Sequence, residues 1–422
     1  MVVHLTACRV EVAMKYVIIG NGIAATCALE AIRRLDSHGR LTLISDEDNL
    51  PYSRPLISHL LAGTLPAAKL PLRPPSFYDD LGVETVFGHR VDSLDPTAKT
   101  VRTTAGKTFS YDRLLIATGG DPRGLAVPGH RLPGIFFLRR LADVRQLLPL
   151  VGEGSEAVVL GGGLVGFKAA EALRCRGLRV TMVIRSPWPL ALQVDEFTGR
   201  LLLDRLRQHG IRVLLGREVK EFAGRERLAK VVLDDGREIS AGLAVIGKGV
   251  RPAIDFVPAA SIKTNQGILV DECLQTSVAD VYAAGDAAEM WDLAYQEPRV
   301  NAIWPEAAAQ GLTAGRNLAG RRARYPGSLG RNVIRFFTLD LLTIGRTNPP
   351  PDGPYRQLTA AAPDGSWYRK LVLHRDRLVG AILVNRIEDG GILQAVIRQQ
   401  RLLRLPPAKL LDRWSWSELW QL

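Results

Sequence analysis

The sequence has few cysteines, and none of them lies close to another along the chain. Cys8, Cys27, Cys175 and Cys273 are the only four in 422 residues, and they form no CxxC or CxxxxC pair. Neighbouring residues therefore cannot form a redox dithiol or provide the ligands of an iron-sulfur cluster. We expect Cys27 and Cys175 to be small packed residues of helices, and we expect no metal site.

Long hydrophobic runs are also absent. No apolar segment reaches the length of a membrane span, and residues 1–13 lack the basic start, apolar core and cleavage site of a secretory signal. Charged residues make up 23% and hydrophobic residues 46% of the chain, as in ordinary globular proteins. The length predicts three domains of ordinary size. These features favour a cytoplasmic protein in which residues 1–13 are an extension before the first strand.

A glycine-rich loop follows the first apolar strand. A predicted strand over 16–19 leads into residues 20–25 (GNGIAA) and then into a predicted helix over 26–35. In a dinucleotide-binding loop, Gly20 permits the turn, Gly22 lets the backbone approach the pyrophosphate, and Ala25 lets the helix pack on the strand. The next predicted strand, 41–45, is followed by Asp46, at the spacing of a carboxylate that holds ribose hydroxyls, with Glu47 as the reserve candidate.

The same arrangement recurs about 140 residues later. A predicted strand over 157–160 precedes residues 161–166 (GGGLVG), a helix over 167–174 and a strand over 179–184. Two such loops, each with the right flanks, indicate two nucleotide cofactors. NAD enzymes usually carry a carboxylate at the end of the second strand, whereas this chain has Arg185, a residue type that can pair with a 2′-phosphate. We expect NAD(H), and Arg185 leaves NADP(H) open.

Further segments carry a family resemblance. They are residues 52–58 (YSRPLIS), 114–120 (LLIATGG), 249–252 (GVRP) and 276–286 (TSVADVYAAGD). Together with the two loops, they make residues 14–345 similar to the pyridine nucleotide-disulfide oxidoreductase superfamily. Within it, the chain resembles the branch of the NADH:rubredoxin reductases and nitrite reductase flavin domains. It also resembles the NAD-reducing flavoprotein subunits of multisubunit 2-oxoacid dehydrogenases of the phenylglyoxylate type.

The resemblance implies an α/β fold with two Rossmann-like, glutathione reductase-like dinucleotide-binding domains and a small α+β C-terminal domain. It implies an FAD-binding domain at 14–121 and 254–330, an inserted NAD(P)-binding domain at 122–253, and a cap or interface domain at 331–422. Asp286 would hold the ribityl hydroxyls of FAD. The residues predicted to bind the cofactors are Gly20, Gly22, Ile23, Ala24, Ala25, Asp46, Glu47, Arg54, Pro55, Ala117, Thr118, Gly119, Gly161, Gly163, Leu164, Val165, Gly166, Arg185, Gly249, Gly285, Asp286 and Trp304.

Two positions depart from the pattern of the family. Many relatives place a lysine after the P-x-L-S motif and a glutamate two residues after the second loop, and these form an ion pair beside the flavin. This chain has His59 and Lys168 there, so that pair cannot form. Either Lys168 puts positive charge near the flavin beside a neutral His59, or Lys168 extends to solvent and His59 merely packs. With Trp304, they are the candidate flavin-proximal catalytic residues.

The chain is basic, with a formal net charge of +12. Part of this charge lies in Arg316, Arg321, Arg322, Arg324, Arg331 and Arg335. Such a surface would steer an acidic redox protein, although ordinary solvated arginine is the other interpretation. No nucleic-acid recognition module is visible. Trp414, Trp416 and Trp420 follow a basic apolar stretch, 398–413, which is compatible with a partner-docking helix, a membrane-surface helix or a segment folded on its own domain.

These observations together predict an FAD-dependent enzyme. It would pass a hydride between NAD(P)H and FAD, and single electrons between FAD and an acidic iron-sulfur or rubredoxin-type protein. The resemblance favours the NADH-linked flavoprotein subunit of a larger complex. A free-standing NADH:rubredoxin, ferredoxin or quinone reductase stays open, as does an electron-wiring subunit that is inactive alone.

Overall fold

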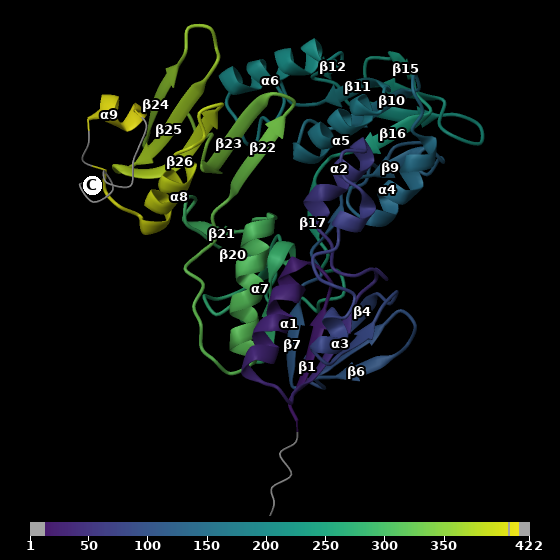
Figure 1. The fold of residues 1–422 in the computed structure, drawn as a ribbon, viewed down its shortest axis with the longest axis vertical. Coiled ribbons are helices and arrows are strands. Elements are labelled where there is room, and N and C mark those ends of the chain that lie inside the picture. Colours follow the sequence, from purple (N-terminus) through teal and green to yellow (C-terminus); the bar gives the residue numbers. More distant parts are fainter. Residues whose placement is uncertain (1–12, 404–405, 413–422) are drawn as a thin grey trace, which may run out of the picture.

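The computed structural model describes residues 13–403 and 406–412. Within these ranges, no helix combines the length and the apolar character needed to cross a membrane. The expectations for residues 1–12 and for the tryptophans Trp414, Trp416 and Trp420 fall outside the described residues. Figure 1 shows a lower lobe that contains β1, α1 and α7, and an upper lobe that contains the remaining large sheets.

The lower lobe is built on a five-stranded parallel sheet with the strand order β19-β7-β1-β2-β3. Its strands are β1 (Lys15–Ile19), β2 (Arg40–Ile44), β3 (Val83–Val86), β7 (Arg113–Ile116) and β19 (Val281–Ala283). Helices α1 (Ile23–Leu35) and α7 (Trp304–Leu318) pack against each other beside this sheet. The central strands are apolar and buried because the sheet has packed residues on both faces.

Smaller elements complete the lower lobe. An antiparallel sheet contains β4 (Val91–Asp95), β5 (Thr100–Thr103) and β6 (Thr108–Ser110). Another small sheet contains β18 (Ile268–Leu269), β20 (Ala288–Asp292) and β21 (Glu297–Arg299). Of the two short helices that follow the first glycine loop along the chain, α3 (Phe77–Asp80) lies in the lower lobe, whereas α2 (Ile57–Ala62) packs in the upper lobe.

A second five-stranded parallel sheet, with the order β12-β11-β10-β16-β9, repeats the first. Its strands are β9 (Ile135–Phe137), β10 (Glu156–Leu160), β11 (Arg179–Ile184), β12 (Arg212–Leu215) and β16 (Leu243–Ile246). The helices of this unit are α4 (Leu141–Leu147), α5 (Leu164–Cys175) and α6 (Glu196–Gln208). An antiparallel sheet of β13 (Val219–Ala223), β14 (Lys230–Leu233) and β15 (Glu238–Ser240) lies beside it.

The chain crosses between the two sheets twice, and the crossings pair with each other. Strand β8 (Gly120–Pro122) runs antiparallel to β17 (Val250–Pro252). The second unit is therefore inserted in the sequence of the first. On this basis we propose the division into residues 14–121 with 254–330, residues 122–253 and residues 331–422.

The C-terminal unit is a five-stranded antiparallel sheet with the order β22-β23-β26-β25-β24. It comprises β22 (Arg331–Phe336), β23 (Leu339–Gly345), β24 (Tyr355–Ala361), β25 (Tyr368–His374) and β26 (Arg377–Val384), followed by α8 (Gly390–Gln399) and α9 (Pro407–Leu411). The sequence predicts only two of these strands, over 333–338 and 370–373, and one helix after them.

Both helices that follow the glycine loops begin three residues before their predicted starts. Helix α1 begins at Ile23 rather than Thr26, and α5 begins at Leu164 rather than Phe167. The reason is that the last three residues of each loop already form the first helical turn. Those residues therefore present their backbone N–H groups where a phosphate would bind.

Candidate functional site

The first glycine loop has the backbone geometry of a dinucleotide site. Gly20 has φ +106°, and a Cβ there would lie 2.2 Å from the carbonyl oxygen of Ala117. Around a Cβ placed on Gly22, by contrast, no described atom lies within 4 Å. The first turn of α1 contains no acidic residue and receives no cap from the side chains that the structure describes. Its N–H groups are thus available to an anion, as FAD binding requires.

The second loop shows the same features. Gly161 has φ +110°, and a Cβ there would lie 2.4 Å from the carbonyl oxygen of Gly247. A Cβ on Gly166 would lie 2.1 Å from the carbonyl oxygen of Gly161, so strand and helix approach too closely for any larger residue. The start of α5 is also free of acidic residues and of caps from described side chains. Helix α6 differs, because the carboxylate of Asp195 caps it by accepting from the N–H of Thr198 at 3.1 Å.

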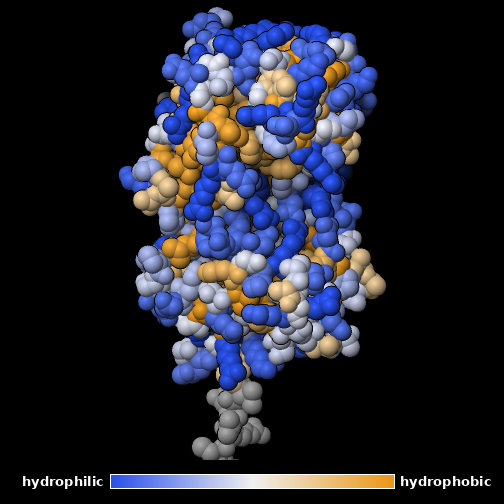
Figure 2. Space-filling view, turned by 90° about the vertical axis from the view of Figure 1, so that its right-hand side faces the viewer, coloured by the Kyte–Doolittle hydropathy of each residue, from blue (hydrophilic) through white to orange (hydrophobic). Residues whose placement is uncertain are grey.

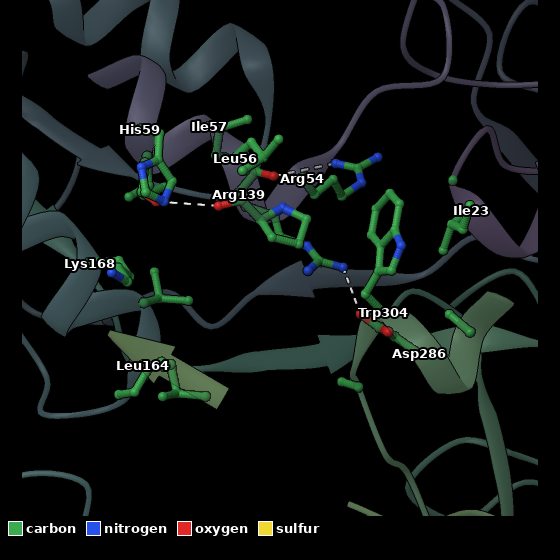
Figure 3. A pocket seen from close by; sticks show the side chains of 18 of the residues that line it. Ile23, Arg54, Leu56, Ile57, His59, Arg139, Leu164, Lys168, Asp286 and Trp304 are labelled. Carbon is green, nitrogen blue, oxygen red and sulfur yellow. Dashed lines mark hydrogen bonds and ion pairs between the residues drawn. The ribbon is translucent and has the colours of Figure 1, made fainter. Parts of the chain in front are cut away.

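A cavity of about 640 Å³ lies where the two nucleotide-binding units and the C-terminal unit meet. Its walls come from both loops, from the ends of β7 and β19, from α2, α5 and α7, and from the β22–β23 hairpin. The structure brings to this one cavity the predicted residues Gly22, Ile23, Ala24, Arg54, Pro55, His59, Ala117, Gly119, Leu164, Val165, Lys168, Gly285, Asp286 and Trp304. Figure 3 shows Asp286 and Trp304 near one end and His59 and Lys168 towards the other.

Asp286 lies in the cavity wall directly after β19. Its carboxylate accepts a 2.8 Å bond from Arg139, and the two side chains are 14% and 22% exposed. The N–H of the preceding residue, Gly285, donates to the side-chain oxygen of Gln310 on α7 at 2.8 Å, which holds the turn in place. A half-buried carboxylate that faces a cavity fits the ribityl hydroxyls, which are hydrogen-bond donors. The sequence analysis did not identify Arg139, because nothing in its local pattern indicates a contact with a residue 147 positions away.

A smaller cavity of about 50 Å³ lies at the ends of β1 and β2, and it contains Gly20, Asp46 and Thr118. Asp46 accepts from Arg140 at 3.0 Å, and Arg140 also contacts Asp121 at 3.3 Å. Although burial opposes the shift, Arg90 and Arg140 hold the pKa of Asp121 below its usual value. These ion pairs join the two lobes, and Figure 2 shows hydrophilic residues across the middle of one face. We propose that the ribose of the FAD adenosine binds here, at Asp46.

Glu47, the reserve ribose carboxylate, points elsewhere. It is 10% exposed, accepts a 2.7 Å bond from the hydroxyl of Tyr52 and pairs with Arg54. Despite burial, which opposes the shift, Arg54 and Tyr52 lower the pKa of Glu47. One oxygen of Glu47 accepts from Arg54, at the wall of the large cavity, and the other accepts from Tyr52. These contacts favour Asp46 as the ribose carboxylate, and Glu47 stays the reserve candidate.

Lys168 has an acidic partner that the sequence interpretation did not consider. Its ammonium group lies 2.7 Å from the carboxylate of Glu171, one turn further along α5, and donates to the carbonyl oxygen of Arg335 at 2.7 Å. Glu171 also accepts from the N–H of Phe337 at 3.0 Å. We name this set of contacts the α5 clamp. It compensates the charge of Lys168, so the predicted positive potential beside the flavin is reduced.

His59 is exposed, and its Nδ1 lies 3.3 Å from the hydroxyl oxygen of Thr64. Trp304 begins α7 and is half-buried in the cavity wall. Two residues later, Glu306 is buried, and it binds Arg331 and, at 2.7 Å, Arg398. Sequence reasoning missed Glu306, which anchors the start of α7 to the C-terminal unit.

The predicted basic surface is not continuous, and the expectation of a single steering patch is wrong. Arg331 is only 19% exposed, because it pairs with Glu306. Arg335 lies at the large cavity and pairs with Asp340 at 2.8 Å. Arg316, Arg321, Arg322 and Arg324 are exposed, but they lie at and beyond the far end of α7, in the lower lobe.

The described thiols lie apart in the fold. Cys27, Cys175 and Cys273 are free cysteines within the described ranges. The expectation that Cys175 is packed is wrong, because it is exposed at the end of α5 and lines the large cavity. Partial burial raises the pKa of the Cys27 and Cys175 thiols, which disfavours the reactive thiolate.

On the nicotinamide side, most predicted residues flank the cavity rather than line it. Arg185 is 80% exposed and lies 3.8 Å from Glu218, which also contacts Lys248 at 3.2 Å. Gly249 has φ +86° at the start of the crossing strand β17. These residues surround the carboxyl ends of the parallel strands, where nucleotides bind in such sheets.

Known proteins match both the sequence and the fold. The sequence model described as pyridine nucleotide-disulphide oxidoreductase matches residues 14–311, and that of the rubredoxin NAD⁺ reductase C-terminal domain matches residues 331–401. The epsilon subunit of NADH-dependent phenylglyoxylate dehydrogenase from Aromatoleum evansii is 30% identical over 93% of each chain. A ferredoxin reductase from Rhodopseudomonas palustris has a TM-score of 0.85 and 27% identity, covering 94% of this chain and 97% of its own.

A Bacillus subtilis assimilatory nitrate reductase electron transfer subunit is 27% identical over 94% of this chain. The chain spans only 51% of the length of that protein. The matches confirm the predicted α/β fold, the family, and FAD and a nicotinamide nucleotide as its cofactors. The glycine geometry, the free helix starts and Asp286 in the cavity fit those cofactors. The chain therefore belongs to the pyridine nucleotide-disulphide oxidoreductase family.

Proposed function

We propose that this protein moves electrons between a nicotinamide nucleotide and an iron-sulfur or rubredoxin-type protein by way of FAD. The observation that carries the proposal is the cavity of about 640 Å³ to which both glycine loops contribute walls. A nucleotide on each loop would extend towards this cavity, so that the two redox rings can meet there. A bound flavin exchanges two electrons with nicotinamide and one with metal centres.

The side chains of the cavity would bind and orient the two rings. The starts of α1 and α5 offer N–H groups to the two pyrophosphates. Asp286 would accept from the ribityl chain, and Trp304 would limit the space at one end of the cavity, since both line it. The described thiols do not form a dithiol, which supports direct transfer from flavin to a docked acceptor.

The partner can be of two kinds. The similarity to a phenylglyoxylate dehydrogenase subunit over nearly the whole of both chains supports a flavoprotein subunit of a larger 2-oxoacid dehydrogenase. The C-terminal match to a rubredoxin reductase domain and the fold match to a ferredoxin reductase support a free-standing reductase. Purification of the tagged protein from its native host separates them, because stable co-purification of thiamine-diphosphate and iron-sulfur subunits supports the complex and a lone chain supports the reductase.

The central test is reconstitution. Purified protein should carry one non-covalent FAD per chain, and NADH or NADPH should bleach the flavin in anaerobic stopped-flow measurements. Turnover with ferricyanide should follow without any partner. Protein that is folded but cannot be loaded with FAD would refute the proposal. Loaded protein whose flavin is reduced but that has no turnover alone would support a subunit that works only in a complex.

A further inference from the structure

The two nucleotide-binding units differ at one informative place. In the first unit, β2 ends at Ile44 and the carboxylate Asp46 follows two residues later, in the smaller cavity. In the second unit, β11 ends at Ile184 and the next two residues are Arg185 and Ser186. Strand register matches Ile44 with Val183, because Ile44 pairs with Ile19 and Val183 pairs with Leu160, each just before a glycine loop. The position of Asp46, the proposed ribose carboxylate of the first unit, is thus taken by the cation Arg185 in the second.

The side chains around this position carry a net positive charge. Arg185 follows β11, Glu218 follows β12 and Lys248 follows β16. The guanidinium of Arg185 lies 3.8 Å from the Glu218 carboxylate, and the ammonium group of Lys248 lies 3.2 Å from it. Two cations therefore share one carboxylate. Arg185 is 80% and Glu218 43% exposed, so their pair is weak and is easily exchanged for a stronger partner.

A 2′-phosphate is such a partner. It carries close to two negative charges, and arginine binds phosphate oxygens through charge-assisted, often bidentate hydrogen bonds. The free 2′-hydroxyl of NADH would gain little from an arginine, and a carboxylate is the group that usually holds it. Resting on the function proposed above, we infer that the chain takes NADP(H), and that Arg185 binds the 2′-phosphate of its adenosine ribose.

The alternative ligand of this position is NADH, and Glu218 would then bind the hydroxyls of its adenosine ribose. The two possibilities predict opposite effects at Glu218. If Arg185 binds a 2′-phosphate, Glu218→Gln removes a competing negative charge and raises the preference for NADPH. If Glu218 binds the ribose of NADH, the same change lowers kcat/KM for NADH and leaves NADPH less affected.

The experiment compares kcat/KM for NADPH and NADH with ferricyanide as acceptor, in the FAD-loaded protein. We expect the wild type to prefer NADPH by about tenfold or more. Arg185→Ala should lower kcat/KM for NADPH by about 10- to 100-fold, the usual effect of losing a charged hydrogen bond, and change the value for NADH by less than about twofold. Arg179→Ala is the matched control, because Arg179 lies at the other end of β11, is 70% exposed and is also paired with a glutamate.

A binding measurement tests the site without turnover. Isothermal titration of the holoprotein with adenosine 2′,5′-bisphosphate and with AMP should show tighter binding of the bisphosphate, and Arg185→Ala should abolish the difference. An equal or higher kcat/KM for NADH in the wild type, or equal binding of the two adenosine ligands, would overturn the inference. Absence of flavin reduction by either nucleotide would instead overturn the proposed function.

Discussion

Replacing Asp286 by alanine should release FAD from an otherwise folded protein. Its carboxylate is 14% exposed in the large cavity, so it is shielded from water and available to the ribityl hydroxyls. Loss of a hydrogen bond to a charged group costs about 1.5–3 kcal/mol, which corresponds to a rise of about 10- to 150-fold in the Kd for FAD. The change also leaves the guanidinium of Arg139 without its carboxylate partner, which lowers the stability of the apoprotein.

The assay is titration of deflavinated protein with FAD, followed by the quenching of flavin fluorescence. Asp280→Asn is the matched control, because Asp280 belongs to the same motif but pairs with Lys99 at 2.8 Å, outside the large cavity. The control should keep the wild-type Kd. If Asp286→Ala also keeps it while its circular dichroism is unchanged, Asp286 does not contact the cofactor and the site is assigned wrongly.

Three further predictions concern the thiols, the α5 clamp and the basic residues. Protein in which all four cysteines are replaced by serine should keep NAD(P)H oxidation with ferricyanide, and lost turnover in folded, FAD-loaded protein would assign a role to a thiol. Glu171→Gln should lower the free energy of unfolding by about 1–3 kcal/mol in urea denaturation, because it weakens a partly buried charged contact; an equal loss in the exposed control Glu156→Gln would contradict this. Reversing Arg321, Arg322 and Arg324 to glutamate should change turnover with purified rubredoxin less than about twofold at 0.15 M salt. Arg321 and Arg322 follow the far end of α7, about 22 Å from Trp304 and beyond the Debye length of about 8 Å, and Arg324 pairs with Glu272 at 3.0 Å. A large selective loss with rubredoxin would restore the steering surface.

The sequence predicted the parts of the fold that depend on local pattern. The order of strand, glycine turn and helix is fixed within 25 residues, so both nucleotide-binding sheets could be anticipated from it. The placement of Asp286 beside the first loop is a long-range feature and came only from the family resemblance. The small sheets of β4 to β6 and of β18, β20 and β21 were missed, because their strands are short or exposed. In the sheet of β13 to β15, only a strand over 228–233 was predicted, from its alternation. Strands β23 and β26 of the C-terminal sheet are buried apolar runs, which periodicity alone does not distinguish from a buried helix.

The site itself shows the same division between local and long-range information. The glycine positions could be assigned from the sequence, because the loop needs a positive φ that most other residues do not adopt. In the structure, Gly20 has φ +106°. The partners of charged side chains could not, since Arg139 meets Asp286 and Arg398 meets Glu306 across 147 and 92 residues of chain. The partner of Lys168 was close in sequence, at the ordinary helical spacing of three residues, and could have been recognised.

The partners of these charged groups determine how the cavity is enclosed. Helix α5 starts at the second glycine loop, and Lys168 and Glu171 on its cavity side bind the backbone of the β22–β23 hairpin. The sheet that begins with β22 is joined in turn to the start of α7, where Arg331 meets Glu306 two residues after Trp304. Charged hydrogen bonds thus attach one end of β22 to α5, through Lys168 and Arg335, and the other end to the start of α7, through Arg331 and Glu306. A shift of α5 would have to break the α5 clamp or move the hairpin with it, so the width of the cavity depends on contacts that all three units of the chain share.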